Sequence, residues 1–443
     1  MDIYTLLLTI LIIKIVEGGG VWDLVQDLIG TITPAVPEDA SLNIQQLAHK
    51  YGYNIDEHTT TTQDGYIINF HRIYCENIKN DAPIVFLMHG ILESSDSWLL
   101  QGPNNSLAYL LAEEGYDVWM GNARGNRHSS EHMTLNNTSS EYWQFSWEEL
   151  GIYDLPAIID YILQETGKDS LHYIGHSQGT TIGYVLLSMK PEYNKKIRVM
   201  YSLAPEAWMG HVESPVIRFF SSAFYLYGSV LLDINTLPLG MDFYTKISSF
   251  LCSTYLSCDN IMYGLSGHGN NINKKLLPII FGHMPTGSSV LQFVHYGQLV
   301  NSQRFCRYDH GADGNMEVYG QPEPPDYDIS QIVAPNVLFY SDNDWLSDRR
   351  DVDILKNKLS NVLAYIHFDM GRGEGQGLVL WTPLLLNETR HKPLDADILR
   401  GHVVSPIEPA HSGRELHGTI KILLIYVPVS VTFSDTWRVV QAR

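Results

Sequence analysis

Cysteine and charge are both scarce in this 443-residue chain, and each shortage excludes a class of protein. Four cysteines without a CxxC pair are too few for a small disulfide-stabilised scaffold, and they form no zinc-binding motif. Charged residues make up 18% of the chain and hydrophobic residues 44%, a balance that excludes intrinsic disorder. The 29 Lys and Arg are outnumbered by 49 Asp and Glu, so the net charge is −20. Such an acidic surface repels phosphate backbones, and we expect no nucleic acid partner.

Apolar runs are too short to cross a bilayer, so we predict no transmembrane span. The run at residues 3–13 falls short because a spanning helix needs about 20 apolar residues. Small residues at Gly18–Gly20 follow it, which is typical of a secretory signal, and we predict that residues 1–19 are a signal peptide. A buried N-terminal helix is the alternative. On a secretory route the glycosylation candidates are Asn104, Asn136, Asn137 and Asn387.

The chain does contain a regular alternation of strand and helix patterns. A capping box at Ser146 and Glu149 begins a helix with apolar residues at helical spacing, and Gly167 ends it. Strands that alternate with helices favour a mostly parallel sheet with helices on both faces, the α/β class. Short apolar runs typical of strands buried on both faces occur at Ile84–Met88, Asp117–Met120, Leu171–Ile174, Ile197–Leu203, Val337–Tyr340 and Val362–Phe368.

Residues 206–325 interrupt this alternation. They are rich in Phe, Tyr, Leu and Gly, and a proline cluster at 322–325 precedes the return of the strand pattern. Because the segment leaves and rejoins the sheet at adjacent strand positions, we interpret it as a cap inserted into a core made of residues 38–205 and 326–370. An independent interaction domain is the alternative interpretation.

The GHSQG sequence at residues 175–179 carries the strongest chemical signal. A GxSxG motif alone is weak, but this one follows the strand pattern at Leu171–Ile174 and precedes a helix pattern at 180–189. Strand, GxSxG and helix together are typical of a nucleophile elbow, a tight turn that presents the hydroxyl of Ser177 at the start of a helix. The flanking glycines suit such a turn because a Cβ would clash there. A plain serine in a strand–helix turn is the alternative.

A serine nucleophile needs a histidine base and a carboxylate that orients the histidine. In this type of fold the carboxylate follows a later strand, and the histidine comes after the carboxylate. Asp344, just after the strand pattern at Val337–Tyr340, fits this position, and Asp342 is its competitor. An acidic surface turn is the alternative to any catalytic acid here.

Attack by a serine also creates an oxyanion, which two backbone N–H groups must stabilise. We expect one from Gln178, directly after the serine, and the other from Ile91, in the loop after Ile84–Met88. His89 and His176 lie too close to these two elements to serve as the base, so we assign them to the framework.

Longer segments resemble the acid lipase family of gastric and lysosomal lipases and their insect relatives. The resemblance extends over residues 38–370, in order and with similar spacing. The matching segments are YGYNIDEHTTTTQDGY (51–66), FLMHGILESSDSW (86–98), YDVWMGNARGNRHS (116–129), YIGHSQGTT (173–181) and YDISQIVAPNVLFYSDNDWL (327–346).

This resemblance implies an α/β-hydrolase fold with a cap over the site. It also implies hydrolysis of triacylglycerols or sterol esters without a cofactor or metal, with a neutral lipid or a lipid–water interface as partner, and a secreted or lysosomal location. By motif, Ser177 becomes the nucleophile, Asp344 the triad acid, and Ile91 and Gln178 the oxyanion donors.

One part of the family pattern is missing. Such lipases follow the last core strand with a segment like FNHLDFLW, whose histidine is the triad base. Here Gly375 stands where that histidine is expected, residues 371–443 do not resemble the family, and His367 comes too early, on the strand itself. The triad histidine therefore stays unassigned, and the tail histidines without family context are His391, His402, His411 and His417.

The cysteines partly match the family. Cys252 and Cys258 lie in the cap, where family members place cysteines, and a disulfide between them would close a short loop. We expect Cys75 and Cys306 to be free and buried. Four free thiols are the alternative.

Two functions remain open at this point. The first is a lipase that uses Ser177. The second is a lipid-binding protein that keeps the fold but lacks the base and therefore the turnover. A third possibility is poor folding, because the altered tail lacks a helix that should cover one face of the sheet.

Overall fold

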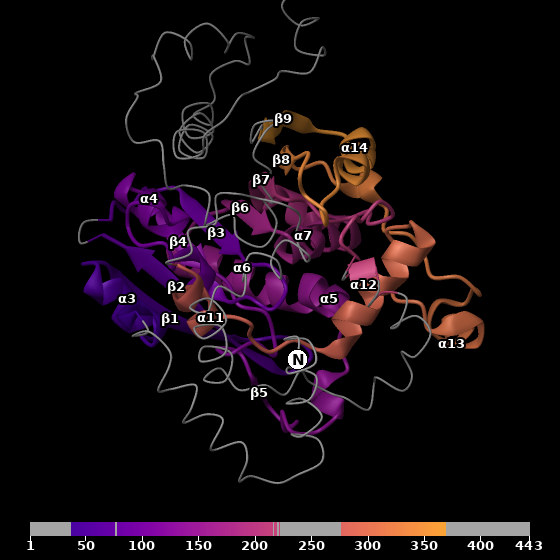
Figure 1. Ribbon diagram of the computed structural model, residues 1–443, viewed down its shortest axis with the longest axis horizontal. Helices are drawn as coiled ribbons and strands as arrows, with labels where there is room; N and C mark the ends of the chain where they lie inside the picture. The colour runs from indigo at the N-terminus through magenta and orange to yellow at the C-terminus, as the bar shows by residue number, and fades with distance from the viewer. Residues whose placement is uncertain (1–36, 76–77, 216, 219–220, 222–275, 369–443) are drawn as a thin grey trace, which may run out of the picture.

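The computed structural model describes most of the predicted core (Figure 1). The described residues are 37–75, 78–215, 217–218, 221 and 276–368. Several predictions lie outside them, namely the signal peptide (1–19), Cys252, Cys258, Gly375, Asn387, the tail histidines and the rest of residues 371–443.

The strands form one mixed sheet, with the order β1-β2-β4-β3-β6-β7-β8-β9 and with β5 paired to β2. Strand β2 pairs antiparallel with β1, β4 and β5. All pairings from β4 through β9 are parallel. In Figure 1 the strands follow one another from β1 at the lower left to β9 at the top. They are β1 (Asn54–Thr61), β2 (Tyr66–Tyr74), β3 (Ile84–Met88), β4 (Asp117–Met120), β5 (Glu131–His132), β6 (Leu171–His176), β7 (Ile197–Leu203), β8 (Asn336–Ser341) and β9 (Val362–Phe368).

Strand β3 shows why the central strands read as continuous apolar runs. Ile84, Phe86 and Met88 point into one hydrophobic cluster, and Val85 and Leu87 point into a second one on the opposite face. Because successive side chains of a strand alternate between faces, both faces of the sheet must be covered. This arrangement confirms the predicted α/β class.

Helices supply the cover on the two faces. Helices α6 and α7 contribute to the first cluster, and α3, α4 and α11 contribute to the second. The helical segments are η1 (Glu38–Ala40), α3 (Ile44–Lys50), η2 (Ser95–Trp98), α4 (Leu107–Glu113), η3 (Glu141–Trp143), α5 (Trp147–Glu149), η4 (Leu150–Asp154), α6 (Leu155–Thr166), α7 (Gln178–Met189), η5 (Pro191–Lys195), α11 (Leu277–His283), α12 (Val290–Ser302), α13 (Gly311–Tyr319), η6 (Ile329–Gln331) and α14 (Arg349–Lys358).

The helix predicted after Ser146 is present but not uniform. The capping box forms, with the Ser146 N–H donating to Glu149 Oε2 at 2.7 Å. A π-helical turn at Leu150–Asp154 then separates α5 from α6. Gly167 ends α6 with a left-handed φ of 65°, as its place after the last apolar residue predicted.

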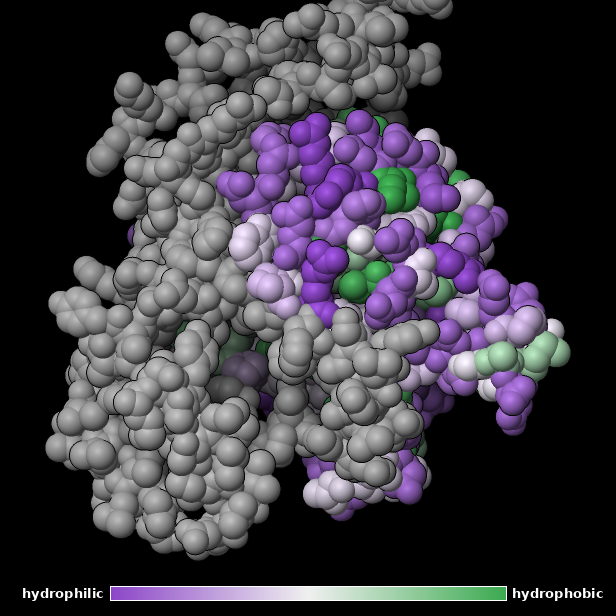
Figure 2. Space-filling view, turned by 45° about the vertical axis from the view of Figure 1, so that its right-hand side comes forward, coloured by the Kyte–Doolittle hydropathy of each residue, from purple (hydrophilic) through white to green (hydrophobic). Residues whose placement is uncertain are grey.

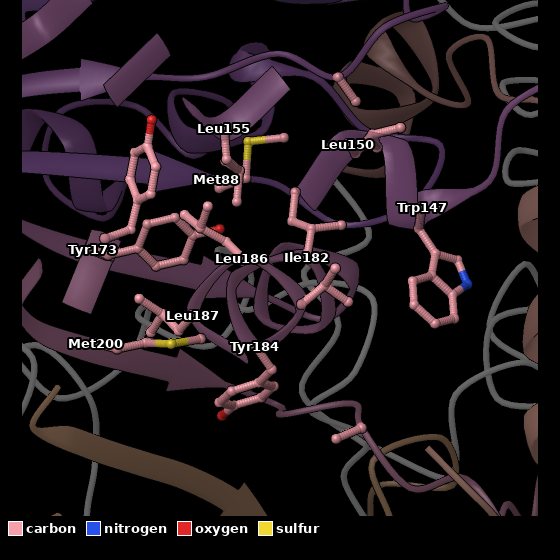
Figure 3. Close-up of a cluster of buried hydrophobic side chains, with 14 of the residues drawn as sticks. Met88, Trp147, Leu150, Leu155, Tyr173, Ile182, Tyr184, Leu186, Leu187 and Met200 are labelled. Atoms are coloured by element: carbon pink, nitrogen blue, oxygen red, sulfur yellow. The ribbon is translucent and has the colours of Figure 1, made fainter. Parts of the chain in front are cut away.

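Helix α7 lies against the centre of the sheet, directly after the GxSxG turn. Its Ile182 and Leu186 share an apolar cluster with Met88, Leu150 and Leu155 (Figure 3). All of these side chains are at most 1% exposed. The helix is therefore held firmly where its first turn meets the candidate site.

The described part of the 206–325 segment attaches to the core next to the loop after β3. The Thr286 N–H donates to Leu92 O at 2.8 Å, and Thr286 Oγ1 donates to Glu93 O at 2.7 Å. The described part of the face in Figure 2 is mainly hydrophilic, with scattered hydrophobic residues. Among the described helices, none is long and apolar enough to cross a membrane.

Candidate active site

Ser177 occupies the sharp turn between β6 and α7. Its φ of 49° and ψ of −119° lie in a region that residues with a Cβ rarely adopt. The Ser177 N–H donates to Leu203 O on the neighbouring strand at 3.0 Å, which fixes the turn to the sheet. The serine is only 5% exposed and precedes the first residue of α7, so its hydroxyl lies at the positive end of that helix.

The two motif glycines are required by close backbone contacts. A Cβ on Gly175 would lie 2.7 Å from the carbonyl oxygen of Gly179. A Cβ on Gly179 would lie 2.3 Å from the carbonyl oxygen of Met88 on β3. Real Cβ atoms do not approach so closely, and the tight turn that carries Ser177 therefore needs glycine on both sides.

The loop after β3 lies directly beside the elbow. A Cβ built on Gly90 would lie 3.2 Å from Ser177 Cβ, so Gly90 and Ser177 are neighbours. Within the described residues, the N–H groups of Ile91 and Gln178 donate no hydrogen bond to the protein. Unpaired N–H groups at a helix start and in an adjacent loop can receive a negatively charged oxygen.

The two candidate acids in the loop after β8 differ in burial. Asp344 is 2% exposed, and its Oδ1 accepts hydrogen bonds from the N–H groups of Leu346 at 2.9 Å and Ser347 at 2.7 Å. Its Oδ2 is buried and has no hydrogen-bond partner in the described part of the chain. Burial outweighs the two backbone hydrogen bonds and raises the pKa of Asp344 to about 8.

The competing acid, Asp342, faces outward. Its side chain is half exposed and pairs with Arg349 at 3.3 Å and with His367 Nε2 at 3.1 Å. His367 lies on β9, as the sequence predicted, and its partner is thus Asp342 and not Asp344.

His89 and His176 lie beside the loop after β3, where the sequence placed them. His89 Nδ1 donates to Gly90 O at 2.7 Å, and its Nε2 accepts from the Ala123 N–H at 3.2 Å. His176 Nδ1 lies 3.5 Å from Glu93 Oε2, and the same Glu93 oxygen accepts from the Gly90 N–H at 2.9 Å. Both rings thus brace the loop that carries Ile91.

Glu206, which no sequence motif marked, also lies beside Ser177. It is 4% exposed, and the nearby Ser177 side chain is the largest influence that lowers the pKa of its carboxyl group. Burial raises the pKa of Glu206 to about 7. One signal could have found it: Glu206 follows β7, the neighbour of β6, and parallel strands end at the same edge of a sheet.

The remaining predicted residues lie away from this group. Cys306 is buried and free, as predicted, whereas Cys75, directly after the end of β2, is free but only half-buried and not buried as expected. The glycosylation candidates Asn104, Asn136 and Asn137 are exposed. In the described ranges, no group of three His, Cys, Asp or Glu side chains could hold a metal ion.

Comparison with known proteins identifies the family. A family model described as the alpha/beta hydrolase fold matches residues 83–372, and one described as a partial alpha/beta-hydrolase lipase region matches residues 44–102. Lipase 1 of Drosophila melanogaster is 41% identical over 334 residues, which are 74% of this chain and 73% of that protein. This chain belongs to the acid lipase family of α/β-hydrolases.

Two mammalian relatives extend the comparison. Gastric triacylglycerol lipase of Rattus norvegicus is 39% identical over 362 residues, covering 77% of this chain and 90% of that protein. Human lysosomal acid lipase/cholesteryl ester hydrolase is 34% identical over 353 residues, covering 78% of this chain and 88% of that protein. Membership in this family makes the chain a lipase-type ester hydrolase by descent and confirms the predicted α/β-hydrolase fold.

Proposed function

We propose that this acid lipase family member hydrolyses the carboxylic ester bonds of neutral lipids, triacylglycerols or sterol esters, through Ser177 and an acyl-enzyme. The observation that carries the proposal is the elbow: a buried serine with φ of 49° at the start of α7, next to Gly90 of the oxyanion loop. The two relatives named for triacylglycerol and for cholesteryl ester supply the substrate class.

In the proposed reaction, Ser177 Oγ attacks the acyl carbonyl carbon. The N–H groups of Ile91 and Gln178 stabilise the oxyanion, a contribution of about 3–4 kcal/mol per donor in well-studied hydrolases. The alcohol leaves, and water then releases the fatty acid from Ser177. Asp344 is the acid that orients and tunes the base, in keeping with its burial and its electrostatic contact with His176 and Glu206.

The proposed setting is a lipid–water interface on the secretory or lysosomal route. Residues 206–325 act as the cap in this proposal, with Thr286 tying the cap to the loop that carries Ile91. The exposed Asn104, Asn136 and Asn137 are the proposed glycan sites.

Hydrolysis of emulsified triolein and cholesteryl oleate by the purified full chain tests this function. Ser177→Ala should lower turnover by roughly 10³-fold or more. Ser188→Ala is the matched control, because Ser188 is another buried serine of α7 whose hydroxyl only bonds to Val185 O. Equal turnover by the Ser177→Ala protein and the unmodified protein would refute the proposal.

Substitution of two neighbouring aspartates tests which of them is the catalytic acid. Asp344→Ala should lower kcat, since it removes the buried carboxyl group that faces His176 and Glu206, whereas Asp342→Ala should leave kcat within about twofold. Rate loss in the Asp342 variant with an unaffected Asp344 variant would reverse the assignment.

A second candidate is a lipid-binding homologue without turnover. One observation favours it: Asp344 Oδ2 is buried without a hydrogen-bond partner among the described residues, as expected if the orienting partner of this acid were lost. Fatty-acid binding by the purified protein with no ester hydrolysis would favour this candidate over the lipase.

A further inference from the structure

The loop after β3 closes on itself as a four-residue turn from Gly90 to Glu93. The Glu93 N–H donates to Gly90 O at 3.3 Å, and the Gly90 N–H donates to Glu93 Oε2 at 2.9 Å. The two bonds are reciprocal, as in a capping box. Ile91, the proposed oxyanion donor, lies inside this turn. Its neighbour Leu92 has a left-handed φ of 62°, which a residue with a Cβ keeps only where its surroundings fix it.

The turn sets the direction of the Ile91 N–H. Gly90 O and the Ile91 N–H belong to one planar trans peptide group and therefore point in opposite directions. Two donors hold Gly90 O, namely the Glu93 N–H at 3.3 Å and His89 Nδ1 at 2.7 Å. Because this carbonyl is held from two groups, the N–H at the other side of the same peptide group is held as well.

The carboxyl group of Glu93 also connects this turn to the elbow. Its Oε2, which accepts from the Gly90 N–H, lies 3.5 Å from Nδ1 of His176, the residue before Ser177. A Cβ built on Gly90 would lie 3.3 Å from His176 Nδ1 and 3.4 Å from Glu93 Cδ. The carboxyl group therefore lies where the loop that carries Ile91 meets the turn that carries the serine.

The 206–325 segment holds the backbone of the same residue. Thr286 Oγ1 donates to Glu93 O at 2.7 Å, and the Thr286 N–H donates to Leu92 O at 2.8 Å. Glu93 is 4% exposed and Thr286 is 7% exposed, so water has little access to these bonds. The side chain and the backbone of Glu93 are thus both fixed, by two different parts of the fold.

We propose that Glu93 is a positioning residue for the oxyanion donor Ile91. Its carboxyl oxygen holds the Gly90 N–H, its own N–H holds Gly90 O, and together they orient the peptide group that carries the Ile91 N–H. The inference rests on the proposed ester hydrolysis and adds to it a residue that acts without touching the substrate. The role requires an acceptor oxygen at this place and not a negative charge.

Two variants of similar shape separate the oxygen from the charge in hydrolysis of p-nitrophenyl butyrate. Glu93→Met keeps an unbranched side chain but offers the Gly90 N–H no oxygen. Since the oxyanion forms only during reaction, kcat and kcat/KM should fall together by about 10–10²-fold, with KM unchanged. Glu93→Gln keeps an oxygen at the same reach, and its rates should stay within about threefold of those of the unmodified chain.

Glu149→Met is the matched control. Glu149 Oε2 likewise accepts from a backbone N–H three residues earlier, that of Ser146 at 2.7 Å, but this bond belongs to the capping box of α5. The control should lower Tm and leave kcat within about twofold. An equal loss of kcat in the Glu93→Met and Glu149→Met proteins would mean that any unpaired N–H harms the enzyme, and it would overturn the role of Glu93.

Thermal unfolding and fluorophosphonate labelling of Ser177 separate a misplaced donor from a damaged fold. The label forms a tetrahedral group whose oxygen needs the same donors, so a folded Glu93→Met protein should be labelled about 10–10²-fold more slowly. If Glu93→Met does not fold, Thr286→Val takes its place, because it removes the hydroxyl that holds Glu93 O. It should lower kcat by about three- to tenfold without changing KM.

The outcomes distinguish this inference from the proposed hydrolysis. A folded Glu93→Met protein with the wild-type kcat, a Glu93→Gln protein as slow as Glu93→Met, or, where Glu93→Met does not fold, a Thr286→Val protein with the wild-type kcat overturns the inference. Inactivity of Ser177→Ala would still support the lipase in each of these cases. No hydrolysis and no labelling in the unmodified chain overturns both.

Discussion

The residue on which function depends most, Ser177, is held in an unfavourable backbone conformation. A φ of 49° at a residue with a Cβ costs on the order of 1–3 kcal/mol, and this strain persists because the sheet and α7 fix both sides of the turn. The sequence could predict this turn, since the glycines at 175 and 179 flank the serine between two regular elements. It could not single out Glu206, because nothing local marks a glutamate that comes to lie near Ser177 only in the folded chain.

Gly179→Ala tests the packing of the turn. The added Cβ would lie 2.3 Å from Met88 O, so we expect a loss of about 1–3 kcal/mol in unfolding free energy together with reduced esterase activity. Gly297→Ala in α12 is the control, since its Cβ would find only ordinary contacts of 3.4 Å or more. Chemical denaturation of both variants gives the comparison, and equal stability would contradict the close approach.

At the scale of elements, apolar runs predicted the central strands because those strands are buried on both faces. The bounds of β3, β4, β7 and β9 coincide with the predicted runs, and β6 extends to His176. The hairpin β1–β2 was not predicted, because β1 reads NIDEHTTT and is mostly exposed or half-buried. An edge strand without a continuous apolar run leaves no such signal.

Helix α11 is joined to the core by a buried charge cluster around Asp96. Asp96 Oδ1 contacts His128 Nε2 at 2.6 Å and Oδ2 contacts His283 Nδ1 of α11 at 2.8 Å, while Arg127 lies 3.1 Å away. Burial alone would raise the pKa of Asp96, but the hydrogen bonds from the two histidines hold it well below its usual value. The stabilisation is therefore present above about pH 4 and lost as the pH falls further.

Asp96→Asn should weaken this junction. Removing one partner of a buried ion pair costs about 3–5 kcal/mol, so a large drop in unfolding free energy is expected. Asp160→Asn removes an exposed carboxylate that pairs with Lys196 at 2.5 Å, and it should change stability by at most about 1 kcal/mol. A comparable effect of both substitutions in thermal unfolding would refute the role given to Asp96.

At the scale of the whole molecule, stability combines contacts that no local pattern contains. Arg307 donates to Glu148 at 2.6 Å across 159 residues of sequence, and such a pairing is set by the fold as a whole. Long family-like segments nevertheless predicted the overall fold, since they fix the order of strands, elbow and acid loop. The resemblance to the family could not identify the catalytic base, because the sequence departs from the family after residue 370.

Two buried carboxyl groups, those of Asp344 and Glu206, and the half-buried one of Glu149 make the whole molecule sensitive to alkaline pH. Burial raises the pKa of Glu149 and Glu206 to about 7 and that of Asp344 to about 8. A carboxyl group with a raised pKa stabilises the fold below its unfolded pKa, and the stabilisation disappears as the pH rises through the folded value. Unfolding free energy should therefore fall by about 1–3 kcal/mol between pH 6.5 and 8.

Titration of the following buried histidines does not change the unfolding free energy between pH 6.5 and 8. Burial lowers the pKa of His71 and His295 to about 3 and that of His172 to about 4, so their effect appears only below about pH 6.5. Asp344→Asn should reduce the loss of Tm between pH 6.5 and 8, and Asp342→Asn should not. A pH-independent Tm over this range in the unmodified chain would count against buried, protonated carboxyl groups.

The most direct test of the account is to trap the acyl group on the protein. The purified chain is mixed with p-nitrophenyl butyrate, quenched in acid within the first turnover, digested and analysed by mass spectrometry. We expect a butyryl group on Ser177 alone, and no adduct in the Ser177→Ala protein. Release of p-nitrophenol without any acyl adduct at Ser177, or an adduct on another residue, would contradict it.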